Sequence, residues 1–207
     1  MTFQTEQENF WAGEFGDDYI GRNVSSSLLA SNLAFFTKAL ARACKPHSCI
    51  EFGANVGMNL KALQLLYPNQ EQYAIEINAT AAAELASTIP PDRIHVGSIL
   101  DFVPDRAWDL VIIKGVLIHI NPDCLPKVYD ALYKSTGQYL LVCEYYNRSP
   151  VTINYRGHTD RLFKRDFCGE ILDRYSDLSL IDYGFAYHRD PNFPQDDITW
   201  FLMEKRD

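Results

Sequence analysis

Residues 48–60, with the sequence SCIEFGANVGMNL, constrain the fold of this chain more than any other segment. An apolar run ends at Glu51, and Gly53 and Gly57 follow before a segment with apolar residues at helical spacing. Glycines at a strand-to-helix turn let the backbone approach a ligand closely, and the first amides of the helix have no partners inside it. The segment therefore predicts a buried strand, a tight ligand-binding turn and a helix.

Apolar runs and helical patterns alternate along most of the chain. The runs expected to form strands are 48–52, 72–77, 93–96, 109–113, 139–143, 178–187 and 198–203. The segments expected to form helices are 58–67, 79–87, 121–133 and 164–175. This alternation predicts an α/β sheet with right-handed crossover connections. The last two runs have no helix between them, so they predict a terminal antiparallel pair.

The 207 residues correspond in length to one domain, with room for a small lid. We expect the first part, 1–45, to form a helical lid or extension. Within it, a helix is expected at 6–12, a loop at 16–25 and a second helix that ends near residue 43. Residues 46–207 are expected to form the ligand-binding domain.

Composition excludes several classes of partner. A formal net charge of −8 argues against nucleic acid, whose phosphates are neutralised by basic surfaces. Five irregularly spaced cysteines without a CxxC pair favour a reducing cytoplasm over a disulfide or zinc framework. The acids Asp190, Asp196 and Asp197 have no histidine at ligand spacing, so we expect no metal. Neither a signal peptide nor an apolar run of about 18 residues is present, so we expect no membrane partner.

The second apolar run ends in Glu76, about twenty residues after the glycine turn, where an acid can accept both hydroxyls of a ribose. Two ligands suit this pattern, a dinucleotide and S-adenosylmethionine. The spacing is E-x-G-x-x-x-G rather than G-x-G-x-x-G, and Glu51 would repel a pyrophosphate but attract the ammonium of a methionine moiety. Asn55 tolerates a left-handed backbone, so the turn remains feasible. The pattern favours adenosylmethionine.

With these features the chain resembles the class I S-adenosylmethionine-dependent methyltransferases over residues 30–205. The segments HVGSILDF (95–102) and WDLVIIKGVLIHI (108–120) match the third and fourth strands of that family and their exits. The segments EQENFWAGEFGDDYIGRN and INYRGHTDRLFKRDF are similar to methylases associated with pseudaminic acid biosynthesis and surface-polysaccharide genes. The resemblance implies a Rossmann-like fold with a mixed seven-stranded sheet, a terminal antiparallel strand and an N-terminal helical lid.

The resemblance also implies which residues hold the cofactor, S-adenosyl-L-methionine. In the main domain these are Glu51, Gly53, Asn55, Gly57, Asn59, Glu76, Ile77, Ser98, Ile99 and Lys114. Tyr19 and Arg22 belong to an N-terminal segment expected to fold over the cofactor, where Arg22 would pair with the methionine carboxylate. A surface salt bridge is the alternative for Arg22.

Methyl transfer from a sulfonium is an in-line displacement that mainly requires alignment and exclusion of water. A general base is needed only when the acceptor must lose a proton. His119, after the fourth strand, is the candidate base because the ordinary pKa of histidine lies near neutrality. Glu144 and Tyr146, after the fifth strand, are the other catalytic candidates. The alternatives are a core histidine and a polar strand end with aromatic packing.

Residues 151–165 concentrate basic and hydrogen-bonding side chains in an acidic protein. Because arginine matches carboxylates and phosphates bidentately, this basic loop suggests an anionic or sugar-derived acceptor. The expected acceptor-binding residues are Tyr145, Asn147, Tyr155, Arg156 and His158. A solvated loop followed by a capped helix is the alternative.

Taken together, the sequence favours a methyltransferase that acts on a small polar metabolite. The resemblance adds that this metabolite is derived from a sugar or sugar acid. Two alternatives remain open, a non-catalytic adenosylmethionine-binding pathway protein and a nicotinamide-dependent oxidoreductase. The protein is expected to be a monomer or homodimer.

Overall fold

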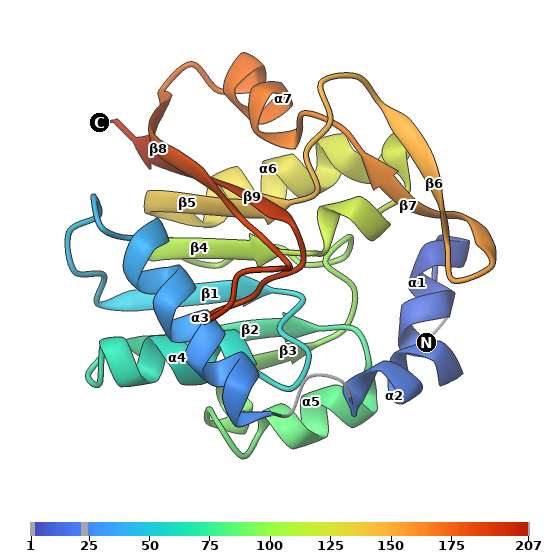
Figure 1. Ribbon diagram of the computed structural model, residues 1–207, viewed down its shortest axis with the longest axis horizontal. Coiled ribbons are helices and arrows are strands. Elements are labelled where there is room, and N and C mark those ends of the chain that lie inside the picture. The colour runs from blue at the N-terminus through green and yellow to red at the C-terminus, as the bar shows by residue number, and fades with distance from the viewer. Residues whose placement is uncertain (1–2, 22–24, 207) are drawn as a thin grey trace.

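A seven-stranded sheet forms the centre of the computed structural model, which describes residues 3–21 and 25–206 (Figure 1). Its strand order is β3-β2-β1-β4-β5-β9-β8. The bounds are β1 (Ser48–Phe52), β2 (Glu71–Glu76), β3 (Ile94–Val96), β4 (Trp108–Lys114), β5 (Thr136–Glu144), β8 (Leu178–Ala186) and β9 (Ile198–Lys205). Strands β1 to β5 are parallel, whereas β9 is antiparallel to both β5 and β8. The expected mixed sheet and its terminal antiparallel pair are confirmed.

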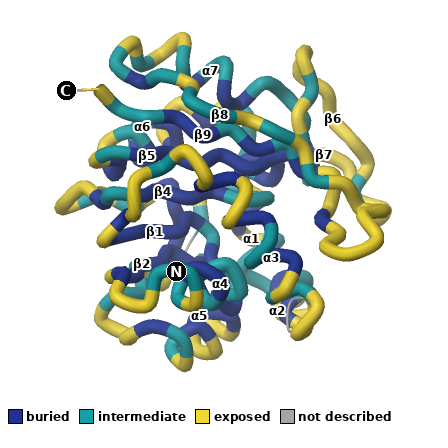
Figure 2. Tube along the Cα trace, turned by 60° about the vertical axis from the view of Figure 1, so that its left-hand side comes forward, coloured by how far each residue is buried: buried dark blue, intermediate teal, exposed yellow. Residues whose placement is uncertain are grey.

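Helices cover both faces of the sheet, and each face has its own apolar core. On one face, α3 (Ser26–Ala39), α4 (Met58–Leu66) and α5 (Ala79–Leu85) contribute buried side chains to a core shared with β4 and β5. On the other face, α6 (Leu125–Ser135) and α7 (Phe167–Arg174) pack against β1, β4 and β5. Strand β1 is consequently buried along its whole length, and most residues of β4 and β5 are buried (Figure 2). This explains why they appear as continuous apolar runs in the sequence.

The N-terminal segment contains two short helices at the carboxyl edge of the sheet, α1 (Glu6–Ala12) and α2 (Glu14–Ile20) (Figure 1). Thr5 and Glu8 form a capping box at the start of α1. The prediction of a loop from residue 16 is wrong, because α2 continues to Ile20. Gly16 lowers local helix propensity, but a Cβ at this position would lie 1.9 Å from the carbonyl oxygen of Trp11. Close packing between the two helices therefore overrides the local preference.

Residues 151–165 form a β-hairpin instead of the expected loop and helix start. Its strands are β6 (Val151–Tyr155) and β7 (His158–Lys164), which pair antiparallel outside the main sheet. Arg156 and Gly157 at the tip both have positive φ, which suits a two-residue hairpin turn. Helix α7 begins only at Phe167, where the Asp166 side chain caps it. The hairpin lies beside α1 and is largely exposed (Figures 1 and 2).

Three short 3₁₀ turns complete the connections, at Pro91–Arg93, Leu117–His119 and Pro122–Cys124. The helix expected at 121–133 therefore begins as a 3₁₀ turn and continues as α6. Helix α3 packs into the sheet core, so the part of 1–45 that overlies the carboxyl edge is α1 and α2. Across the described ranges, no helix combines the length and apolar character needed to cross a membrane.

Gly57, at the start of α4, generates a prediction about stability. Its φ is 79°, and an added Cβ would lie 2.5 Å from Cδ1 of Leu85. We expect Gly57→Ala to lower the free energy of unfolding by about 2–4 kcal/mol, from the left-handed backbone and from overpacking. Gly157→Ala is the matched control, since Gly157 has φ 85° but open space around it. Urea titration of both variants measures the difference in unfolding free energy. Equal decreases in the two variants would contradict a contribution from overpacking against Leu85.

Candidate active site

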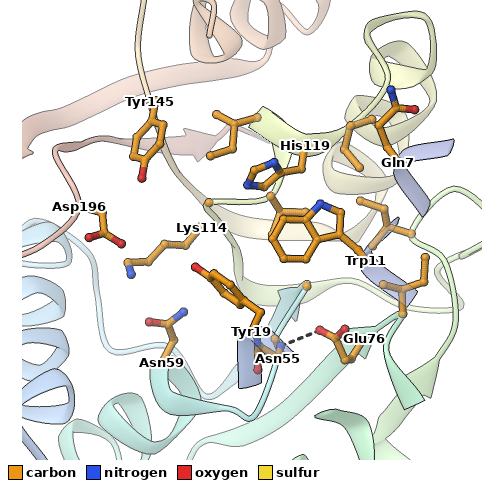
Figure 3. Close-up of a pocket in the computed structure, with 18 of the residues that line it drawn as sticks. Gln7, Trp11, Tyr19, Asn55, Asn59, Glu76, Lys114, His119, Tyr145 and Asp196 are labelled. Atoms are coloured by element: carbon orange, nitrogen blue, oxygen red, sulfur yellow. Dashed lines mark hydrogen bonds between the residues drawn. The ribbon is translucent and has the colours of Figure 1, made fainter. Parts of the chain in front are cut away.

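A cavity of about 270 Å³ lies at the carboxyl ends of the parallel strands, beneath α1 and α2 (Figure 3). Its walls come from the turn after β1, the ends of β2 and β4, and the segment that precedes β9. Helix α1 and strand β6 contribute side chains from above. This edge is where open α/β sheets bind ligands, because the strand-to-helix turns leave backbone groups without partners there.

Glu76 connects the turn after β1 to the end of β2. One carboxylate oxygen accepts a hydrogen bond from the amide of Asn55 at 2.7 Å (Figure 3). The other accepts a hydrogen bond from the amide of Asn78 at 2.8 Å. Asn55 has φ 48°, the left-handed conformation expected for it. Burial raises the pKa of Glu76. The carboxylate still lines the cavity, and each oxygen has a further lone pair for a ligand.

The two glycines of the turn have different surroundings. Gly53 lines the cavity with φ 76°, and a Cβ there would lie 2.6 Å from Cγ2 of Val116. Gly57 lies behind the cavity wall, against Leu85. The close backbone approach expected of both residues is therefore placed at Gly53, whereas Gly57 serves the packing of α4.

Glu51 lies one layer behind the cavity rather than facing it. Its side chain is fully buried, and one oxygen accepts a hydrogen bond from Nδ2 of Asn59 at 2.6 Å. Burial raises the pKa of Glu51 to about 8, although the Asn59 hydrogen bond opposes this. Asn59 itself lines the cavity. Glu51 therefore reaches the cavity wall only through its hydrogen bond with Asn59.

One end of the cavity brings together Asn59, Lys114, Tyr145, Asp196 and Tyr19 (Figure 3). Lys114 ends β4, and its ammonium lies 5.7 Å from the ring centroid of Phe35. It is the one Lys or Arg side chain among the described residues of the wall. Asp196 comes from the segment before β9 and was not expected here.

The opposite wall combines apolar side chains with a carboxylate from α1. Ile77, Ser98 and Ile99 line the cavity as expected. The hydroxyl of Ser98 donates a short hydrogen bond to Glu8 of α1, which is itself buried. Helix α1 is therefore attached to the loop after β3 through this pair.

His119 lies on the turn after β4, and its Nδ1 is 2.6 Å from the carbonyl oxygen of Arg161 in β7. A carbonyl only accepts, so Nδ1 carries the hydrogen and Nε2 keeps a free lone pair. Burial lowers the pKa of His119 to about 4. The expectation of a pKa near neutrality is therefore wrong. The ring packs between Trp11 at 4.6 Å and Tyr155 at 5.0 Å (Figure 3).

Glu144 ends β5 but does not line the cavity. One of its oxygens accepts from the amides of Val116 at 3.0 Å and Leu117 at 2.9 Å. Burial raises the pKa of Glu144 to about 7. The carboxyl group thus holds the turn that carries His119, and the catalytic contact expected of Glu144 is replaced by this supporting one.

The residues expected around an acceptor divide between two places. Tyr145 and Tyr155 line the cavity. The others lie outside it: Tyr146 packs near Phe201 with 44% of its surface exposed, Asn147 bonds to Ser149, Arg156 occupies the hairpin tip, and His158 contacts Phe10. The alternation of side chains and the outward turn of the hairpin explain this separation. Arg22 lies outside the described residues.

Several wall residues were missed by reasoning from the sequence. They are Gln7, Glu8, Trp11, Val116 and Asp196. The aromatic density of NFWAGEFGDDY was a usable signal for Trp11, since such side chains cover ligand sites. Nothing local in the sequence marks the others. Among the described residues, no group of three or more His, Cys, Asp or Glu could hold a metal ion.

Comparison with known proteins identifies the fold. No protein-family model and no curated protein matches the chain. Among solved structures, the 1,6-didemethyltoxoflavin-N1-methyltransferase of Burkholderia thailandensis, bound to its substrate and S-adenosylhomocysteine, has a TM-score of 0.70 at 15% identity, over 100% of this chain and 92% of that chain. A SAM-dependent methyltransferase of Leishmania major has a TM-score of 0.69 at 13% identity, over 97% of this chain and 81% of that chain. The sugar N-methyltransferase KedS8 of a Streptoalloteichus species has a TM-score of 0.66 at 12% identity, over 95% of this chain and 94% of that chain. The chain therefore has the Rossmann-like methyltransferase fold.

The burial of His119 makes stability depend on pH. The folded-state pKa of about 4 lies below the ordinary 6.5, so the stabilising contribution is complete above pH 6.5 and is lost as pH falls towards 4. The loss amounts to about 3 kcal/mol of unfolding free energy. We expect His119→Gln to lack this component, whereas His47→Gln, which removes an exposed imidazole, should retain it. Urea unfolding between pH 4 and 7 measures both, and parallel curves for wild type and His119→Gln would contradict the assignment.

Proposed function

We propose that the protein is an S-adenosylmethionine-dependent methyltransferase that acts on a small polar molecule. The main support for this proposal is that Glu76 is hydrogen-bonded to the Gly53–Gly57 turn and that both line one cavity of the methyltransferase fold. The turn offers backbone groups to the ligand, and Glu76 offers the remaining lone pairs of its carboxylate to a ribose.

The other wall residues fit the same cofactor. Asn59 and Lys114 would hold the methionine end, while Ile77 and Ile99 would enclose the adenine. When bound, the cofactor supplies a methyl group on a positively charged sulfur. Among the described residues of the wall, Glu8, Glu76 and Asp196 face the cavity with one cation, the ammonium of Lys114. This excess of carboxylates suits a cationic sulfonium and opposes the pyrophosphate of a dinucleotide, so a nicotinamide-dependent oxidoreductase is disfavoured.

Residues on the other side of the cavity would bind the acceptor. Trp11 and Tyr155 provide aromatic surfaces there that suit a ring or the face of a sugar, and Tyr145 adds a third from the end of the cavity that also holds Lys114. The Nε2 lone pair of His119 would accept a hydrogen bond from a hydroxyl or amine of the acceptor. The lone pair of that acceptor atom would then point away from His119 and be free to attack the methyl group. Because His119 stays neutral, it can take up the proton as the methyl group is transferred.

The structure does not favour the anionic acceptor that the basic segment suggested. Arg156 and His158 lie outside the cavity, and the acceptor side contains no cation within the described wall. We therefore propose a neutral or amine-bearing acceptor. The resemblance to pseudaminic-acid-associated methylases and the sugar N-methyltransferase neighbour both support a sugar-derived molecule.

Two further assignments accompany this function. We propose that residues 1–45 act as an extension whose first two helices close the site, and that 46–207 form the methyltransferase domain. The described cysteines are all free, and Cys49, Cys143 and Cys168 are buried, which supports a reducing compartment such as the cytoplasm.

Glu76→Gln tests the cofactor assignment. We expect S-adenosylhomocysteine to bind about 10–100-fold more weakly, because a charge-assisted hydrogen bond to the ribose is worth about 1.5–3 kcal/mol. Glu84→Gln, an exposed position on the neighbouring helix α5, is the matched control. Calorimetry provides the affinities, and thermal unfolding shows that the turn is intact. Unchanged affinity in Glu76→Gln would remove the ribose assignment, and tight binding of NADH instead would revive the oxidoreductase.

The pH profile of methyl transfer tests the role of His119. With a pKa of about 4, His119 is neutral from pH 6 to 8, so its ionisation should leave kcat unchanged in this range. His119→Asn should lower kcat by about 10²-fold or more while leaving cofactor affinity unchanged. Transfer of labelled methyl groups to amino sugars, neutral sugars and sugar acids provides both measurements. A wild-type rate that rises through pH 6.5 would contradict the neutral imidazole. Cofactor binding without transfer to any compound would favour the non-catalytic alternative.

A further inference from the structure

Two neighbouring residues of β7 contact both the lid and His119. The carbonyl oxygen of Arg161 is 2.6 Å from Nδ1 of His119, whereas its guanidinium donates to Glu6 of α1 at 3.0 Å. The carbonyl oxygen of Asp160 accepts from Nε2 of Gln7 at 3.0 Å. The backbone that orients His119 is therefore the same backbone that receives α1.

The Arg161 side chain lies within the interface between the hairpin and α1. It is 17% exposed, compared with 82% for its partner Glu6, and its guanidinium lies 5.5 Å from the ring centroid of Phe10. An ion pair with so exposed a partner contributes little alone. The cation–π contact with Phe10 adds to it, and α1 is also attached through Gln7 to the Asp160 carbonyl and through Glu8 to Ser98. Arg161 is therefore one of several residues that dock α1.

The backbone beside Arg161 is held in a conformation that requires support. Asp160 has φ 55°, which is uncommon for a residue other than glycine. Such conformations persist when surrounding contacts determine them. Here the Asp160 carbonyl accepts hydrogen bonds from Nε2 of Gln7 in α1 and from the Arg161 guanidinium, each at 3.0 Å, beside an irregularity in the pairing of β6 with β7. Loss of the α1 contacts would remove one of these two donors from the backbone next to the Arg161 carbonyl.

His119 also depends on the lid through its ring faces. Trp11 of α1 lies 4.6 Å from the imidazole, and Tyr155 of the hairpin lies 5.0 Å from it. The imidazole is thus enclosed by the same two elements that Arg161 joins. Glu144 fixes the turn below, but it reaches backbone amides only and does not determine the imidazole tautomer.

We infer that Arg161 is a positioning residue: its side chain docks α1, and its carbonyl then fixes His119 with the hydrogen on Nδ1 and the lone pair on Nε2. The catalytic consequence rests on the proposed function, because Nε2 is the atom assigned to the acceptor. With α1 displaced, the carbonyl would no longer be held in place, and the hydrogen would exchange between the two ring nitrogens. Docking of α1 and fixation of the His119 tautomer are therefore coupled.

Nitrogen-15 NMR of histidine-labelled protein tests this inference, with the His119 signals assigned by comparison with His119→Gln. In the wild type we expect hydrogen on Nδ1 of His119 from pH 5 to 8. Arg161→Gln should give averaged tautomer shifts and an imidazole that titrates closer to the ordinary 6.5. Arg161→Lys, which keeps the cation, should restore much of the wild-type spectrum. Arg174→Gln removes a 3.0 Å ion pair to Asp130 away from the cavity and should leave the spectrum unchanged.

A second variant addresses the same contacts from the lid. Glu6→Gln combined with Gln7→Leu leaves the hairpin sequence intact, so it should shift the His119 tautomer even if Arg161→Gln does not fold. We expect a larger decrease in kcat than in the affinity for S-adenosylhomocysteine, both for Arg161→Gln and for the double variant. The fold-decrease in kcat should exceed the fold-decrease in affinity by a factor of at least about ten. Folded variants that retain the wild-type tautomer would overturn the inference. Failure of the wild type to bind S-adenosylhomocysteine would instead overturn the proposed function, and the NMR result would still decide the role of Arg161.

Discussion

The carboxylate of Glu76 is the contact on which the geometry of the site depends. It accepts the amides of Asn55 and Asn78, so it joins the turn after β1 to the start of α5. A buried carboxylate without such donors would be strongly unfavourable, and an Asn55 amide without an acceptor would leave the left-handed turn unsupported. The same group then faces the cavity, so the residue that stabilises the turn also offers acceptors to the ligand.

A second layer of polar residues supports those that face the cavity. Glu51 holds Asn59, Glu144 holds the turn before His119, and the carbonyl of Arg161 holds the imidazole. None of the three acceptor groups needs to reach a ligand to affect its binding. Because the three acceptors lie behind the wall, rotation of Asn59, of the turn before His119 or of the imidazole would break a hydrogen bond to a buried or partly buried group. These bonds favour one arrangement of the wall residues that they reach.

The electrostatics of the cavity follow from the same arrangement. Carboxylates outnumber cations on the described wall, and the one imidazole is neutral because it is buried between Trp11 and Tyr155. This charge balance favours a cationic ligand over an anionic one. Helices α1 and α2 contribute residues to the wall, so the N-terminal segment is part of the cavity.

The sequence by itself determined the strands of the main sheet and the helices between them, the turn at Gly53–Gly57 and the acid at Glu76, but it did not indicate α2 or the β6–β7 hairpin. These features depend on local periodicity and on the spacing of glycine and glutamate, which one segment of chain displays completely. Only the tertiary structure decided which side chains reach the cavity. Tyr145 faces it while its neighbour Glu144 does not, because consecutive residues of an extended chain point to opposite sides. Tyr155 faces it while Arg156, in the left-handed turn of the hairpin, does not. Trp11, Glu8 and Asp196 come from segments distant in sequence, and burial of His119 beside Trp11 and Tyr155 lowers its pKa. Burial is a property of the assembled fold, so no local pattern could have predicted it.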